Sequence, residues 1–187
     1  MQTAFRKLSS ATAHRNPWFS VHVDQVERPG GIQGPFYWID MKPGASVLPL
    51  TPEMDVYLVR EYKYPMQRAS LEAVSGGIED GETPGQSAER ELREEGGLEA
   101  AVWTDIGRID PFTTSVRGAN FLFVAAGLRQ VGQALEEGEQ VEIVRMPFTA
   151  AVELAMSGAI THGTTCMLLL KTAELLRRHG GSFFGIG

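Results

Sequence analysis

Cysteine is almost missing from this chain: Cys166 is the only one among 187 residues. A single cysteine excludes a disulfide framework and a thiolate metal site, and we expect it to be a small buried residue near the start of the last helix. The four histidines are scattered, with none at a metal-ligand spacing, which argues against zinc chemistry. The sequence also has no nucleophile elbow and no phosphate-binding P-loop, which excludes the enzyme classes that depend on these motifs.

Long apolar runs and an excess of basic residues are missing as well. No stretch is long and apolar enough to span a bilayer, and the N-terminal residues lack the apolar block of a secretion signal. The 17 basic and 23 acidic residues give a net charge of −6, which argues against broad binding of nucleic acids or membranes. We therefore expect a cytoplasmic protein that binds neither. The 43% of apolar residues is enough to bury the core of one ordinary domain.

The pattern of strands and helices predicts an α+β fold with a mixed sheet. Two aromatic-rich extended segments around the turn Pro29-Gly30-Gly31 predict an antiparallel hairpin near the N-terminus. Further strands are expected at 45–50, 56–62, 103–109, 120–125 and 141–146, and helices at 84–95, 149–157 and 164–179. We expect a β arm over residues 1–44, a main domain over residues 45–180 and a flexible tail over residues 181–187.

The predicted helix at 84–95 carries carboxylates where its own electrostatics oppose them. Thr83 as N-cap, Pro84 and Gln86 form its start, and glycines at 96 and 97 end it. Glu91 and Glu95 share a face near the C-terminal end, where each like-charge pair or dipole conflict costs about a few tenths of a kcal/mol. A divalent cation bound through oxygen ligands would convert this repulsion into coordination. The alternative is a solvated helix with ion pairs such as Arg90 with Glu94.

The residues of this segment resemble the Nudix box, in which a glycine is followed at fixed spacing by a glutamate and then by R-E-U-x-E-E-x-G-U, where U is a bulky aliphatic residue. Every position matches: Gly76, Glu82, Arg90, Glu91, Leu92, Glu94, Glu95, Gly97 and Leu98. Such a fixed spacing is much more specific than a generic charged helix.

Two upstream segments resemble the branch of ADP-ribose pyrophosphatases and nucleoside diphosphate sugar hydrolases. These are the strand from Val59 to Lys63 and the stretch from Leu71 to Gly76. Lys63 stands where arginine is usual, which keeps the charge but loses the bidentate fork for a phosphate. Ser75 replaces an alanine whose backbone carbonyl the family uses as a metal ligand. A proline typical of enzymes for ADP-ribose is matched only approximately, by Pro111, so the expected substrate widens to nucleoside diphosphate sugars.

The resemblance implies a Nudix α/β/α sandwich with a mixed sheet and an N-terminal antiparallel β arm. It implies a pyrophosphohydrolase that uses Mg²⁺, or Mn²⁺ in its place, to split a nucleoside diphosphate sugar into a nucleoside monophosphate and a sugar phosphate. The implied metal ligands are the Ser75 carbonyl, Glu91 and Glu95, with Glu94 supporting a further ion. Glu139 is the preferred base, with Glu137 as the alternate, and Arg90 orients the glutamates. Relatives of this branch also imply a homodimer.

The sequence leaves alternatives open for the substrate contacts and for the type of activity. The candidate contacts are cations, a carboxylate and aromatic side chains: Arg60, Lys63, Arg117, Glu72, Trp18 and Trp38. Each cation could equally be an ordinary surface charge, and hairpin aromatics more often pack across strands. A catalytically silent Nudix sensor of nucleotide sugars is one alternative function. A hydrolase of nucleoside triphosphates or dinucleoside polyphosphates is the other.

Overall fold

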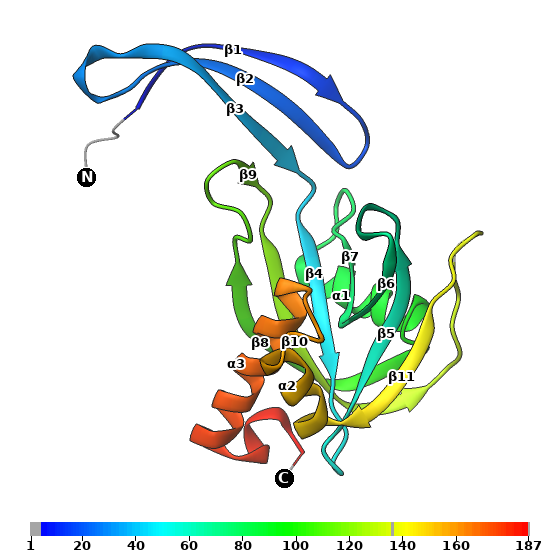
Figure 1. Ribbon diagram of the computed structural model, residues 1–187. Helices are drawn as coiled ribbons and strands as arrows, with labels where there is room; N and C mark the ends of the chain where they lie inside the picture. Colours follow the sequence, from blue (N-terminus) through cyan, green and yellow to red (C-terminus); the bar gives the residue numbers. More distant parts are fainter. Residues whose placement is uncertain (1–4, 136, 187) are drawn as a thin grey trace. The chain divides into compact units, whose positions relative to one another are not determined.

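A computed structural model describes residues 5–135 and 137–186, so the first four residues of the expected arm and the last residue of the expected tail lie outside the described part. The chain divides into two compact units. Met1–Pro43 and Asp110–Ala119 form the first, and Gly44–Ile109 and Asn120–Gly187 form the second. Figure 1 shows the elements of both units.

The first unit is a four-stranded sheet in the order β1-β2-β3-β9. Its first three strands are antiparallel neighbours, and the two-residue β9 is parallel to β3. The predicted hairpin of β2 and β3 is therefore confirmed. Strand β1 was not anticipated, because its ten residues are mostly polar and all exposed, without an alternating apolar face. The strand bounds are β1 Arg6–Arg15, β2 Phe19–Glu27, β3 Gln33–Met41 and β9 Val116–Arg117.

The second unit contains two sheets. One has the order β7-β4-β10-β8, in which only the β4–β10 pair is parallel, and the other has the order β11-β5-β6 with antiparallel pairs. The predicted mixed sheet is thus confirmed. The strand bounds are β4 Gly44–Pro49, β5 Asp55–Lys63, β6 Arg68–Glu72, β7 Val74–Gly77, β8 Leu98–Ile109, β10 Asn120–Gln130 and β11 Glu142–Pro147.

Two apolar cores lie on opposite faces of these strands, because successive side chains of a strand point to opposite sides. Val47 of β4 belongs to the core beneath α1 (Pro84–Glu94), together with Ala88 and Leu92 of that helix. The next residue, Leu48, belongs to the core that also includes Leu168. That second core lies beneath α2 (Phe148–Met156) and α3 (Gly163–His179). Helices therefore cover both faces, as the α/β/α expectation required (Figure 1).

The C-terminal segment differs from the flexible tail that the sequence suggested. Gly181–Phe184 form a 3-10 turn, and the Phe184 ring is fully buried in the core beneath α2 and α3. Two adjacent aromatic residues in a glycine-rich segment show no periodicity, so only the packed structure reveals which of them is the anchor. No helix in the described part of the chain is long and apolar enough to cross a membrane.

Candidate active site

The helix α1 begins as its sequence predicted. The backbone N–H of Gln86 donates to Thr83 Oγ1 at 3.3 Å, and the backbone N–H of Thr83 donates to Gln86 Oε1 at 2.9 Å. Pro84 occupies the first helical turn, where its missing N–H costs nothing. This capping box fixes the start of the helix, and with it the direction in which the acidic residues of the last turns project.

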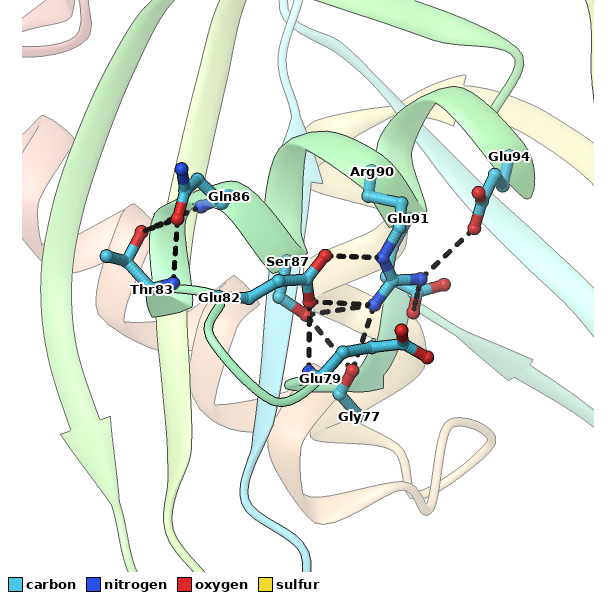
Figure 2. A network of polar contacts seen from close by, with 9 residues as sticks. All are labelled: Gly77, Glu79, Glu82, Thr83, Gln86, Ser87, Arg90, Glu91 and Glu94. Atoms are coloured by element: carbon cyan, nitrogen blue, oxygen red, sulfur yellow. Dashed lines mark hydrogen bonds and ion pairs between the residues drawn. The ribbon is translucent and has the colours of Figure 1, made fainter.

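The Arg90 guanidinium is the centre of a polar network (Figure 2). It donates to Glu82 Oε1 at 2.8 Å, to Glu91 Oε1 at 2.7 Å and to Glu94 Oε2 at 3.1 Å. It also donates to the backbone carbonyl of Gly77 at 2.9 Å. The hydrogen bond to Glu82 is the main reason why the pKa of Arg90 is raised above its usual value. Arg90 thus binds three carboxylates and the loop ahead of the helix at once, which fits its predicted orienting role.

The Glu91 carboxylate is buried against the backbone of Gly76. Glu91 is 8% exposed, and a Cβ placed on Gly76 would lie 1.8 Å from Glu91 Oε1. Only glycine therefore leaves room for this carboxylate. Burial raises the pKa of Glu91, while its hydrogen bond to Arg90 opposes the shift.

Glu95 lies beside the edge strand β7. Burial, together with the charge of Glu91, raises the pKa of Glu95 to about 7, although a hydrogen bond from the Ser75 backbone favours the ionised form. The N–H and C=O of one residue in a strand point to the same side, so the Ser75 carbonyl faces the same edge as its N–H. The three predicted ligand groups, Glu91, Glu95 and the Ser75 carbonyl, are thus brought to one edge of the sheet.

The proposed base also approaches this edge. The negative charge of Glu139 contributes to the raised pKa of Glu91, as does that of Glu94. Glu137 is not among the main causes of the raised pKa of Glu91 or of Glu95. Of the two candidate bases, Glu139 is thus the one whose charge acts on Glu91 among the main causes.

Two of the predicted substrate contacts lie next to the acidic edge. Lys63 forms an ion pair with Glu61, and its Nζ lies 3.8 Å from Glu72 Oε2. Burial lowers the pKa of Lys63, but Glu61, Glu72 and Glu95 outweigh that effect and raise it. Sequence reasoning missed His162, whose Nδ1 lies 3.4 Å from Glu72 Oε2. No sequence signal links the two residues, because they are 90 positions apart.

The remaining predicted contacts have partners of their own. Arg60 Nη1 donates to both carboxylate oxygens of Glu142, at 3.1 and 2.9 Å, so it is not an uncommitted phosphate ligand. In the first unit, Arg117 forms an ion pair with Asp40, and its Cζ lies 4.8 Å from the ring centroid of Trp38.

Trp38 and Trp18 differ in how much ring surface they offer. The His22 ring stacks on Trp38 at a centroid distance of 4.4 Å, so this indole already contacts both His22 and Arg117. Trp18 is 68% exposed. Of the two candidate aromatics, Trp18 therefore exposes more of its ring.

The donor set at the acidic edge fits a hard divalent cation. Glu91, Glu95 and the Ser75 carbonyl offer only oxygen, and the two carboxylates mutually disfavour ionisation in the absence of a counter-charge. Among the described residues, no group of three His, Cys, Asp or Glu side chains is already arranged to hold an ion.

Comparison with known proteins agrees with this geometry. The model of the NUDIX domain matches residues 40–164, and that of the nucleoside diphosphate sugar hydrolase N-terminal domain matches residues 5–39. A solved structure described as an ADP compounds hydrolase superimposes with a TM-score of 0.81 at 23% identity, covering 94% of this chain and 96% of its own. This similarity confirms the predicted fold.

Three relatives of known name align with 84% of the chain. The ADP-ribose pyrophosphatase of Mycobacterium tuberculosis (strain ATCC 25618 / H37Rv) is 27% identical, and 78% of its length is covered. The ADP-ribose pyrophosphatase of Bacillus subtilis (strain 168) is 31% identical, and the methanol dehydrogenase activator of Bacillus methanolicus is 33% identical, each covered over 87% of its length. Since the NUDIX domain match spans more than half of the sequence and two relatives exceed 30% identity, this chain belongs to the NUDIX family.

Proposed function

We propose that this Nudix hydrolase splits the pyrophosphate bond of a nucleoside diphosphate sugar, ADP-ribose or a related compound, into a nucleoside monophosphate and a sugar phosphate. The observation that carries the proposal is the gathering of Glu91, Glu95 and Ser75 at one sheet edge, with Arg90 holding the acidic helix to the preceding loop. The match of residues 5–39 to an N-terminal domain of nucleoside diphosphate sugar hydrolases supports this substrate class.

Magnesium is the proposed cofactor, with manganese as a substitute. Glu91, Glu95 and the Ser75 carbonyl would hold it, with Glu94 supporting a further ion. When bound, the ion neutralises phosphate charge and acidifies a coordinated water. Arg90 keeps Glu91 and Glu94 in place, and Lys63 adds a positive charge close to Glu95 that suits a phosphate.

Glu139 is the proposed general base. A base must come within hydrogen-bond reach of the attacking water, and Glu139 is an exposed carboxylate whose charge acts on Glu91. Glu139→Gln should lower kcat by about 100-fold or more, in the range of general-base effects. Glu137→Gln, two positions away on the same loop, is the matched control and should retain near-normal kcat. The reverse result would transfer the role to Glu137.

Several of the predicted contacts are retained as proposals for substrate recognition. We propose Lys63 and Glu72 near the acidic edge, and Trp18 in the arm for the nucleobase. Trp38, Arg117 and Arg60 act mainly through the contacts that they already make. We further propose a cytoplasmic homodimer, which the lack of a disulfide framework and an arm that exposes one whole edge strand support. Light scattering coupled to size exclusion tests the dimer.

The decisive experiment is an incubation with Mg²⁺ and a panel of nucleotide sugars. ADP-ribose, ADP-glucose, GDP-mannose and UDP-glucose are compared with nucleoside triphosphates and dinucleoside polyphosphates, and products are separated by ion-exchange chromatography. Release of a nucleoside monophosphate from one of the sugars, abolished in Glu95→Gln, is the expected result. Tight binding without products would favour the silent sensor. That outcome has to be tested because one relative bears the name of an activator.

A further inference from the structure

The N-terminal end of α3 contacts the strand corner that carries the active-site residues. Ala73 lies at this corner: Glu72 before it pairs with Val59 of β5, and Val74 after it pairs with Val47 of β4. The chain therefore leaves one sheet and enters the other at Ala73. Three residues of the proposed site lie within three positions of Ala73. They are Glu72, Ser75 and Gly76, against which the Glu91 carboxylate packs.

A buried side chain of α3 satisfies the backbone at this corner. The Ala73 N–H donates to Thr165 Oγ1 at 2.8 Å, and Thr165 is fully buried. An unpaired buried N–H is costly, so this hydroxyl determines where the corner can lie. A second contact joins β6 to the segment just before α3, because Arg68 Nη2 at the start of β6 donates to Thr161 Oγ1 at 2.5 Å.

His162, the N-cap residue of α3, links this hydroxyl to the Glu72 carboxylate. Its Nδ1 lies 2.9 Å from Thr165 Oγ1 and 3.4 Å from Glu72 Oε2. An ionised carboxylate only accepts hydrogen bonds, so a proton on Nδ1 is needed to stabilise the contact. Burial lowers the pKa of His162, which favours the neutral ring and leaves one nitrogen to carry that proton.

We propose that His162 and Thr165 are positioning residues, which hold the corner Glu72–Ser75 so that the Glu72 carboxylate and the Ser75 carbonyl meet substrate and metal. The proposal rests on the proposed function. Neither residue belongs to the Nudix box, and both come from the last helix, about 90 positions away. Groups that orient metal ligands from behind commonly change metal affinity or activity by about 10- to 100-fold when they are removed.

Two pairs of variants separate positioning from general stability. His162→Leu removes the Nδ1 donor, whereas His162→Asn keeps an N–H close to that place. Thr165→Val removes the acceptor at nearly constant shape, whereas Thr165→Ser keeps it. Leu169→Ala removes apolar packing from the same helix but no hydrogen bond, so it is the control for lost stability.

The measurements are kcat and KM on the nucleotide sugar that the panel identifies, Mn²⁺ affinity by electron paramagnetic resonance without substrate, and the melting temperature. We expect His162→Leu and Thr165→Val to weaken Mn²⁺ binding and lower kcat by about 10-fold, with Asn and Ser restoring most of both. Leu169→Ala should lower the melting temperature at least as much and keep kcat and Mn²⁺ affinity at 25 °C.

Several results would overturn the proposal. Unchanged Mn²⁺ affinity and kcat in His162→Leu is one, and it remains decisive if Thr165→Val does not fold. If His162→Asn lost as much Mn²⁺ affinity and kcat as His162→Leu, the Nδ1 donor would have no special role. If Leu169→Ala lost as much, the effect would be one of ordinary packing. Failure of the proposed function is a separate result: the wild-type protein would then hydrolyse no nucleotide sugar, while the Mn²⁺ measurements would still report on the corner.

Discussion

Glu91 Oε1 occupies the place where a side chain at position 76 would begin, because a Cβ on Gly76 would lie only 1.8 Å from that oxygen. Real Cβ atoms do not approach other atoms so closely, so the first glycine and the second glutamate of the Nudix box are sterically linked. The glycine is needed for the carboxylate beside it, and not for an unusual backbone conformation, since Gly76 is not among the positive-φ glycines of the chain.

Gly76→Ala should therefore displace the Glu91 carboxylate and lower kcat by about 100-fold, the loss that a misplacement of about 1 Å commonly causes. The control is Gly85→Ala on α1, the helix that carries Glu91, because a Cβ added at Gly85 meets nothing within 4 Å. That variant should keep its activity. Steady-state kinetics with the substrate of the panel make the comparison, and near-normal activity of Gly76→Ala would contradict the steric argument.

Arg90→Lys should lower the stability of the protein although the charge is retained. Arg90 donates to Glu82, Glu91, Glu94 and the Gly77 carbonyl from a planar fork, whereas a lysine has one nitrogen. We expect a loss of about 2–3 kcal/mol in the free energy of unfolding, since the buried Glu91 carboxylate loses its hydrogen bond to the guanidinium. Urea denaturation measures it. Arg93→Lys, on the exposed side of the same turn, should change stability by less than about 0.5 kcal/mol.

Glu95 should make the metal-free protein less stable as the pH rises. Its pKa is about 7 in the folded state against a usual 4.5, so the folded state holds the proton more tightly than the unfolded state. The contribution of Glu95 to the free energy of unfolding then falls between about pH 4.5 and 7 and is constant above pH 7. The full shift corresponds to about 3 kcal/mol, and water at this half-buried site reduces it. Denaturation in EDTA at pH 5 and 8 should show a decrease that Glu95→Gln diminishes.

Metal binding should release protons for the same reason. At pH 6.5 Glu95 is largely protonated in the absence of metal, whereas a ligating carboxylate must be ionised. Apparent Mn²⁺ affinity should rise from pH 6 to 8 and then level off. Calorimetry in two buffers of different ionisation enthalpy counts the protons. An equal heat of binding in both buffers at pH 6.5 would exclude Glu95 as a protonated ligand.

Phe184→Ala should destabilise the protein by about 3–5 kcal/mol, the cost of removing a buried aromatic ring. Phe184 is fully buried, whereas the neighbouring Phe183 is 39% exposed and is the matched control. Phe183→Ala should cost much less. Thermal or urea denaturation measures both variants, and equal small effects would mean that the C-terminal turn contributes little to the core.

The sequence alone was sufficient for the features that depend on local spacing. Helix α1 and its capping box follow from Thr83, Pro84 and Gln86, and the fixed spacing of the box residues on that helix identifies them without any tertiary contact. Strands with strong apolar patterns, such as β5 and β10, were also predicted. The exposed strand β1 was not predicted because it lacks apolar periodicity, and β6 and β7 were not because they are short.

Only the tertiary structure decided which distant residues meet. That Arg60 pairs with Glu142, that Trp38 lies against His22 and Arg117, and that His162 reaches Glu72 depends on strand pairing and helix packing across tens of residues. Local spacing determines the face of a helix on which a carboxylate stands, because the helix repeat is constant. Its burial, its partners and therefore its pKa arise from the whole fold, because they depend on what packs against it.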